Sequence, residues 1–188
     1  VDTILDKEPE TIKWINSFKN NSIFWDIGAN IGLYTIYAAK KKKKIKIYSF
    51  EPSTSNLRTL SRNVSINKLQ KNVFIIPFAL SNSKNKLLQL KEKQFTEGGA
   101  LNAFGVKYDY SGKNFFVENS YNTFGTSIDD LIEKRILETP NYIKIDVDGI
   151  EDLILIGAKN MLSNKKIKSV LIEINDKFSI QKKKIFKV

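Results

Sequence analysis

WDIGANIG, residues Trp25–Gly32, is the stretch that decides the fold. An apolar run from Ser22 to Ile27 precedes the glycines, and a helix-like pattern follows them. Asp26 closes the predicted strand, and Gly28 and Gly32 lie four residues apart. Glycine lets a backbone turn sharply and approach a ligand closely. The segment therefore predicts that a nucleotide-like cofactor binds at the carboxyl edge of a parallel sheet.

An acidic residue ends the next predicted strand. Glu51 lies 19 residues beyond Gly32 and is followed by Pro52, which cannot continue a strand ladder. A carboxylate at this distance from a glycine turn accepts hydrogen bonds from the hydroxyls of a ribose. The alternative makes Glu51 a solvated strand end and the glycines simple turn formers, but the three features together favour cofactor binding.

The glycine pattern also narrows the cofactor. Asn30 occupies the place of the middle glycine that a dinucleotide fingerprint needs beside the pyrophosphate. The chain also lacks the G-K-[ST] sequence of a phosphate-binding loop. S-adenosylmethionine, which has a ribose and an amino-acid tail but no pyrophosphate, fits both observations.

Composition excludes several chemistries. The 188 residues contain neither cysteine nor histidine, which rules out thiolate nucleophiles, disulfides, Cys/His zinc sites and imidazole bases. A chain without cysteine fits a reducing compartment, so we expect a cytoplasmic protein. The net charge of +11 allows a polyanion such as RNA as partner. Runs such as Lys40–Lys44 nevertheless favour lysines spread over solvated faces.

Strand-like and helix-like segments alternate along most of the chain, which predicts a parallel, doubly wound α/β sheet in a single domain over 1–188. The expected strands are 22–27, 45–50, 73–78, 141–147 and 168–174. The expected helices are 9–20, 31–40, 55–67, one that begins after the N-cap Ser127, and 149–162. Residues 83–124 break the alternation. We interpret them as a hairpin-like insertion over the sheet edge, with strands near 86–90 and 114–124, and as the source of substrate contacts.

Four motifs in this order and spacing resemble those of the FkbM-type methyltransferases over about residues 22–176. They are Asp26–Gly32, Phe50–Pro52, Ala79–Ser81 and Lys144–Glu151. The family more often has Glu at the position of Asp148. The resemblance implies a Rossmann-like class I fold, S-adenosylmethionine as cofactor and, in most members, O-methylation of sugars and natural products.

The resemblance also implies which residues bind the cofactor. They are Asp26, Gly28, Ala29, Asn30, Gly32, Glu51, Pro52, Ala79 and Asp146. Members of the family usually continue past this C-terminus through further strands. We therefore expect residues 177–188 to form a helix leading into them, and the sheet of this chain to lack its C-terminal strands.

A second group of ionisable residues lies near the carboxyl end of strand 141–147. Alternation places Lys144, Asp146 and Asp148 on one face of it. We interpret Asp148 as the cap of the next helix, with Glu151 closing a capping box. Lys144 pairs with Asp146, which leaves Asp146 as the preferred catalytic residue.

Glu173 ends the next strand, beside Asp146. The two carboxyl groups either share a proton, one of them acting as the base, or bind a divalent cation together with Asn175. The predicted function is O-methylation of a hydroxyl on a sugar, glycan or related small molecule. The alternatives are an RNA methyltransferase, although the chain has no N/D-P-P-Y/F motif, and a non-catalytic binding module of the same fold.

Overall fold

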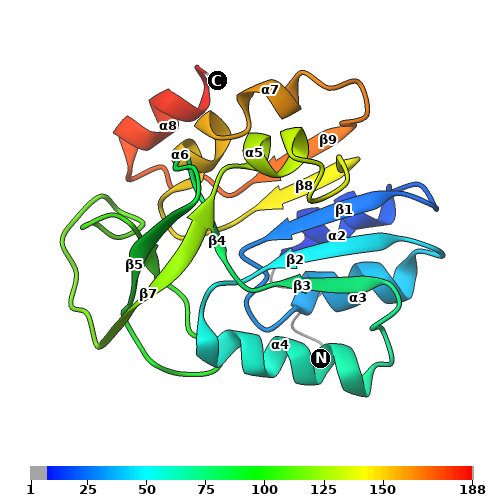
Figure 1. Ribbon diagram of the computed structural model, residues 1–188, viewed down its shortest axis with the longest axis horizontal. Coiled ribbons are helices and arrows are strands. Elements are labelled where there is room, and N and C mark those ends of the chain that lie inside the picture. The colour runs from blue at the N-terminus through cyan, green and yellow to red at the C-terminus, as the bar shows by residue number, and fades with distance from the viewer. Residues whose placement is uncertain (1–7, 188) are drawn as a thin grey trace.

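The computed structural model describes residues 8–187, and a five-stranded parallel sheet organises them (Figure 1). Its strand order is β3-β2-β1-β8-β9. The strands are β1 (Ile23–Ile27), β2 (Lys46–Phe50), β3 (Val73–Ile76), β8 (Tyr142–Ile145) and β9 (Ser169–Ile172). All five expected strands are present, and the order reverses direction at β1, as in other doubly wound sheets.

The register brings the carboxyl ends of the strands to one edge. Asp26 on β1 pairs with Ser49 on β2 and with Lys144 on β8, and Ile145 on β8 pairs with Ile172 on β9. The residues that follow these strands therefore meet above the same edge, where a doubly wound sheet binds its ligand.

Helices cover both faces of the sheet (Figure 1). Helices α2 (Pro9–Asn16), α3 (Leu33–Lys41) and α4 (Thr54–Ile66) pack in one buried apolar cluster with Phe24 and Ile47. The opposite cluster contains Trp25 and Ile143 and is covered by the remaining helices. These are α5 (Ile128–Glu133), α6 (Glu151–Ile156), α7 (Lys159–Leu162) and α8 (Ser179–Ile185). Neighbouring residues of a strand point to opposite faces, and consecutive residues such as Phe24 and Trp25 are both apolar. Both faces of the sheet are therefore apolar, and helices must cover each of them.

Two helices differ from the sequence expectation. Helix α2 ends at Asn16 rather than near 20, although Phe18 stays in the core and stacks on Tyr142 with ring centroids 3.9 Å apart. The helix expected over 149–162 is divided into α6 and α7 at Gly157. A Cβ at Gly157 would lie 2.3 Å from the backbone oxygen of Ser81. The helix is therefore interrupted where Gly157 packs closely against Ser81, a residue far away in sequence.

The insertion forms a second sheet with β4 (Ala79–Leu80). It contributes β5 (Lys86–Glu92), β6 (Ala103–Phe104) and β7 (Asn119–Thr126), in the order β4-β7-β5-β6. Strands β5 and β7 are antiparallel, as a hairpin requires. The second strand was expected to begin at residue 114, but β7 begins at Asn119. Ser127 caps α5 as predicted, since its Oγ accepts a 3.1 Å hydrogen bond from the Asp130 amide.

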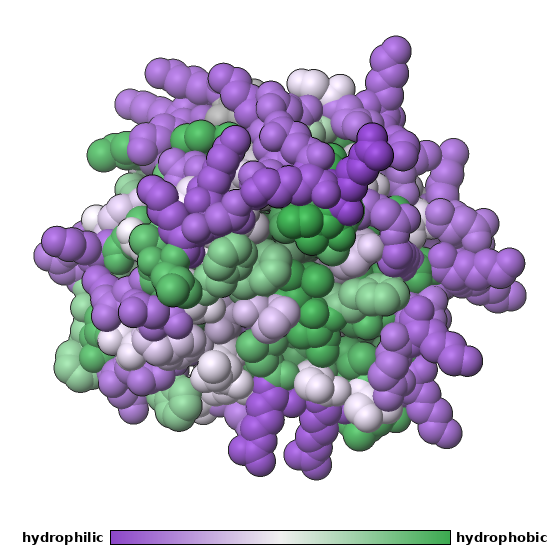
Figure 2. All heavy atoms as spheres, viewed as in Figure 1, coloured by the Kyte–Doolittle hydropathy of each residue, from purple (hydrophilic) through white to green (hydrophobic). Residues whose placement is uncertain are grey.

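The surface is strongly hydrophilic around its rim. On the face drawn in Figure 2, hydrophilic side chains project all round a more apolar central region. Within residues 8–187, none of the helices is long and apolar enough to cross a lipid bilayer.

Candidate functional site

The glycine turn is wedged between the ends of β2 and β8. The amides of Gly28 and Ala29 both donate to the Phe50 oxygen, at 3.0 and 2.9 Å. Gly28 has φ +81°, and a Cβ there would lie 1.8 Å from the backbone oxygen of Asp146. Only glycine fits this position, since both the backbone conformation and the space exclude a side chain. The turn therefore packs tightly against the end of β8, and its residues Gly28, Ala29 and Asn30 line the cavity described below.

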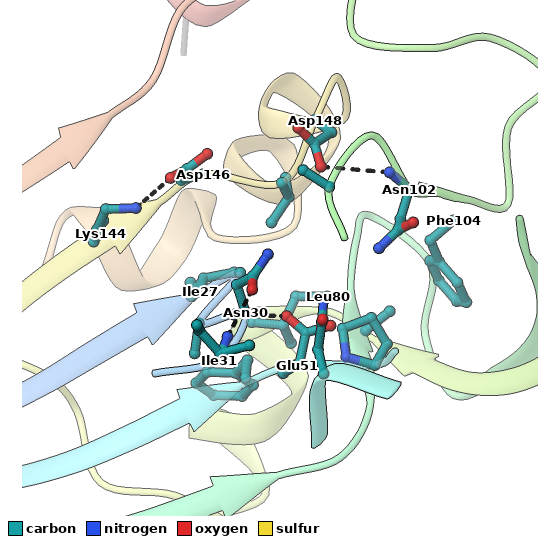
Figure 3. Close-up of a pocket in the computed structure, with 18 of the residues that line it drawn as sticks. Ile27, Asn30, Ile31, Glu51, Leu80, Asn102, Phe104, Lys144, Asp146 and Asp148 are labelled. Atoms are coloured by element: carbon teal, nitrogen blue, oxygen red, sulfur yellow. Dashed lines mark hydrogen bonds and ion pairs between the residues drawn. The ribbon is translucent and has the colours of Figure 1, made fainter. Parts of the chain in front are cut away.

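Asn30 connects three parts of the site (Figure 3). Its amide donates to Glu51 Oε2 at 2.8 Å, and its side-chain Nδ2 donates to the Gly99 oxygen at 3.1 Å. Its φ of 51° is a left-handed value that asparagine tolerates better than most residues. A glycine at position 30, as in a dinucleotide-binding motif, would have no side chain and could not make this hydrogen bond to the insertion.

Glu51 is buried at the end of β2 and lines the cavity described below. Its Oε2 receives the Asn30 amide, and its Oε1 receives the Ser53 amide at 2.8 Å. Burial raises the pKa of Glu51 to about 7, against the opposing effect of these hydrogen bonds. Each carboxylate oxygen has a second lone pair, so the group can still accept hydrogen bonds from a ligand.

Asp26 and Gly32 lie beneath the site. Asp26 is 1% exposed, and its Oδ2 accepts a 2.6 Å hydrogen bond from the Thr35 hydroxyl on α3. Burial raises the pKa of Asp26, and the positive charge of Lys144 opposes that rise. Gly32 begins α3, and a Cβ there would lie 2.4 Å from a methyl group of Leu60. Both were predicted to bind the cofactor, but neither is among the described residues that line the cavity.

Lys144, Asp146 and Glu173 form a charged group at the other end of the cavity. Lys144 Nζ lies 2.5 Å from Asp146 Oδ2 and 4.9 Å from the ring centroid of Tyr34. The side chain of Lys144 is only 4% exposed, so this ion pair is well shielded from solvent at its lysine end. A hydrogen bond with Asp146 raises the pKa of Glu173 to about 8, with burial as the second cause. Asp146 and Glu173 thus lie within hydrogen-bonding reach of each other, an arrangement in which two carboxyl groups can share a proton.

The capping interpretation of Asp148 is wrong. Helix α6 has Ile150 at its N-cap, without a side-chain hydrogen bond. Asp148 has a left-handed φ of 61°, which turns its carboxylate toward the insertion, where Oδ2 accepts the Leu101 amide at 2.6 Å. Glu151 does reach back, as a capping box requires, and accepts from the amides of Gly149 and Val147.

The side chain of Asn175 makes its hydrogen bonds with other groups than the two carboxyls. Its Nδ2 donates to the Tyr110 oxygen at 3.2 Å, and its Oδ1 accepts the Lys177 amide. Across residues 8–187, no group of three or more His, Cys, Asp or Glu side chains is placed to hold a metal ion. The expected alternative of a cation bound with Asn175 therefore has no support in the geometry.

A cavity of about 430 Å³ brings these residues together. Glu51 and Pro52 line one side, and Asp146 and Glu173 line the opposite end. Ala79, a predicted cofactor ligand, lies in the wall next to an apolar part formed by Leu80, Leu90 and Phe104. The volume falls in the range of small-molecule sites, and the cradle at Gly28 and the buried carboxylate of Glu51 fit an adenosyl ligand.

Sequence reasoning missed the residues that close this cavity. Asn56, in the first part of α4, accepts from the Gly98 amide at 2.8 Å and donates to the Gly99 oxygen at 3.0 Å. Asn102 lines the wall two residues before Phe104. Neither asparagine belongs to a spaced motif. The only sequence signal was the glycine pair in the insertion.

Comparison with known proteins gives the family. The profile described as methyltransferase FkbM domain matches residues 26–184. The chain belongs to the FkbM methyltransferase family. Members of this family use S-adenosylmethionine, and the match spans every motif from the glycine turn to Glu173.

Two curated methyltransferases are similar to this FkbM-family chain. Hexuronic acid methyltransferase AglP of Haloferax volcanii is 25% identical over 157 residues, which cover 84% of this chain and 57% of AglP. Methyltransferase sdnD of Sordaria araneosa is 36% identical over 169 residues, which cover 77% of this chain and 63% of sdnD. The chain thus spans roughly three fifths of the length of each of these two relatives.

Solved structures confirm the fold of the FkbM-family chain as Rossmann-like class I. A methyltransferase FkbM from Methylobacillus flagellatus superposes with a TM-score of 0.53 at 20% identity, over 82% of this chain and 33% of that one. A putative rRNA methylase from Clostridium thermocellum gives 0.55 at 9% identity, over 95% and 76%. At such identities the likeness describes the fold alone.

Proposed function

We propose that this chain transfers a methyl group from S-adenosylmethionine to a hydroxyl of a sugar, glycan or related small molecule. The observation that carries the proposal is the Asp146–Glu173 pair, which lies in the same cavity as Glu51 and the glycine turn. A base and a cofactor cradle that share one cavity suit the alkylation of a weakly acidic hydroxyl. The name of AglP, a hexuronic acid methyltransferase, agrees with an acceptor of this class.

The chain's own residues account for cofactor binding. Glu51 would accept hydrogen bonds from the ribose hydroxyls, and the backbone from Gly28 to Asn30 would hold the amino-acid tail. Pro52 and Ala79 would contribute apolar wall. When bound, the cofactor supplies an electrophilic methyl group. Asp26 and Gly32 would support binding indirectly, by holding the glycine turn in place. Asp26 does so through its hydrogen bond with Thr35, and Gly32 through its close packing against Leu60.

Asp146 is the proposed proton acceptor. The ammonium of Lys144 at 2.5 Å favours the ionised form of Asp146, whereas Glu173 holds the shared proton. The bound cofactor would supply the methyl group and leave as S-adenosylhomocysteine when its carbon–sulfur bond breaks, and the Asp146 carboxylate would take the proton that the acceptor hydroxyl loses. Ordering the two reactants can lower the barrier by ~7–11 kcal/mol, and a positioned base contributes ~10²–10⁴ in rate.

RNA methylation is the second candidate, because the net charge is +11. The cavity itself has the opposite character. Glu51, Asp146, Asp148 and Glu173 line it, against the single ammonium of Lys144. A phosphate-rich acceptor would meet repulsion at this wall where the carboxyl groups are ionised, so the cavity disfavours a polyanion such as RNA.

A methyl-transfer assay tests the proposal. The protein is incubated with S-adenosylmethionine carrying a radiolabelled methyl group and with separate panels of neutral sugars, uronic acids and RNA. We expect label in a sugar panel, and a rate at least about 100-fold lower for Asp146→Asn at saturating cofactor. Glu51→Ala should instead weaken cofactor binding. The exposed Glu10→Gln on α2 is the matched control and should change neither quantity.

The outcomes separate the candidates. Label only in RNA, with steep salt dependence, would replace the sugar proposal by the second candidate. Cofactor binding without label in any panel would favour the non-catalytic binding module. Full activity of Asp146→Asn would remove the base assignment, and unchanged cofactor affinity of Glu51→Ala would remove the ribose assignment.

A further inference from the structure

One stretch of the insertion forms the outer wall of the cavity. Residues 98–102, between β5 and β6, include four that line it: Gly98, Gly99, Ala100 and Asn102. Asn30 and Asn56 hold its first half through the Gly98 amide and the Gly99 oxygen. The wall is therefore attached to the glycine turn and to α4, the two elements that flank Glu51.

Asp148 holds the second half of this wall. Its Oδ2 accepts the amide of Leu101 at 2.6 Å and that of Asn102 at 3.4 Å, and Figure 3 shows the carboxylate directed at Asn102. Asp148 and Leu101 both have left-handed backbones, with φ of 61° and 67°. Both residues of this hydrogen-bonded pair therefore have a strained backbone. Proteins retain such strain where a functional site needs a fixed geometry.

The consequence is the position of the Asn102 side chain. Asn102 directly precedes β6, and its side chain lines the same cavity as that of Phe104 (Figure 3). Both line the cavity next to Leu80 and Leu90, its apolar part. Asn102 Oδ1 is buried, and among the residues that the structure describes it has no hydrogen-bond partner. A buried acceptor without a partner is costly, and rotation of the side-chain amide would turn this oxygen into the cavity that Asn102 lines, where a ligand can supply the donor.

We propose that Asn102 recognises the adenine edge of the cofactor, and that Asp148 is the positioning residue that sets its orientation. A side-chain amide matches adenine, because its oxygen accepts from the 6-amino group and its nitrogen donates to an adjacent ring nitrogen. The apolar wall of Leu80, Leu90 and Phe104 suits the faces of the base. The inference rests on the proposed cofactor and extends it to a residue outside the family motifs quoted above.

Binding of two probes tests it without turnover. The probes are S-adenosylhomocysteine and its analogue with hydrogen in place of the 6-amino group, measured by calorimetry. The wild-type protein should prefer the first by about tenfold or more, because the analogue leaves Oδ1 unpaired. Asn102→Ala should reduce the preference to less than about twofold, whereas Asn102→Asp keeps an acceptor oxygen and should retain it. Asn122→Ala, an exposed change on β7, is the matched control.

Asp148 is tested by the same ratio. Asp148→Ala should lower the preference to nearly that of Asn102→Ala, and the double variant should lose no more. Asp148→Asn retains an acceptor oxygen and should keep most of it. A structural defect alone would weaken both probes equally and leave the ratio unchanged.

Each failure has its own signature. If Asn102→Ala keeps the wild-type preference, or the wild type has none, the adenine assignment is overturned while the proposed cofactor stands. If the wild type binds neither probe, the proposed cofactor falls and this inference falls with it.

Discussion

The backbone oxygen of Asp146 occupies the space that a side chain at position 28 would need: it lies 1.8 Å from an ideal Cβ on Gly28. The turn that holds the proposed cofactor and the strand end that carries the proposed base are thus in direct backbone contact. Any shift of one moves the other, which couples cofactor binding to the position of the base.

Gly28→Ala tests this contact, and Gly98→Ala is its matched control. Both glycines have left-handed φ, +81° and +78°, but a Cβ at Gly98 would meet nothing closer than 3.9 Å. The control should cost about 1–2 kcal/mol in the free energy of unfolding from backbone strain alone. Gly28→Ala should cost at least about 2 kcal/mol more, because the Asp146 backbone must move. Urea denaturation measures both, and equal costs would contradict the close contact.

Replacing Lys144 should destabilise the protein strongly. Lys144→Met leaves Asp26 and Asp146 near each other without their buried cation, which we expect to cost about 3–5 kcal/mol in unfolding free energy. Lys134→Met, which breaks the Asp130 ion pair of a half-exposed lysine, should cost less than about 1 kcal/mol. Adding Asp26→Asn should recover part of the first loss. A cost for Lys144→Met as small as for the control would show that the ion pair is not shielded.

The pH dependence of methyl transfer should show an ascending limb near pH 8. Below that pH, Glu173 carries the proton that it shares with Asp146, and the pKa of Glu173 is about 8. As this proton leaves, Asp146 loses the donor that competes with the acceptor hydroxyl, so kcat should rise between pH 7 and 9. Glu173→Gln cannot titrate and should lack the limb. Its persistence in that variant would assign it to another group.

Asp129 should matter for stability and not for binding. Its carboxylate accepts the amides of Asn160 at 3.0 Å and Met161 at 2.8 Å, and so caps α7 from α5, 31 residues before Asn160 in the chain. Asp129→Ala should lower the unfolding free energy by about 1–2 kcal/mol. Affinity for S-adenosylhomocysteine, measured by calorimetry, should stay unchanged. Reduced affinity would indicate that α7 supports the cavity.

The strand ends were predictable from the sequence because local patterns encode them. Glu51 could be placed since an apolar run, a proline and the spacing from Gly32 all coincide, and Glu173 was expected beside Asp146 because parallel strands align their carboxyl ends. These expectations needed only the order of the elements and the direction of each strand.

Contacts between distant segments could not be predicted in this way. The local pattern at Asp148 favoured a capping box, but its left-handed φ sends the carboxylate to Leu101, 47 residues away. The helix break at Gly157 depends on Ser81, and Asn56 depends on the glycine pair of the insertion. Such contacts leave no periodic signature in a single sequence.

The absence of histidine from this chain has an unexpected counterpart in the cavity. Burial and neighbouring carboxyl groups raise the pKa values of Asp148, Glu51 and Glu173 to about 6, 7 and 8. Three groups that are fully ionised in water therefore exchange protons across the neutral range, where imidazole ordinarily does so. The cavity therefore gains negative charge as the pH rises through the neutral range.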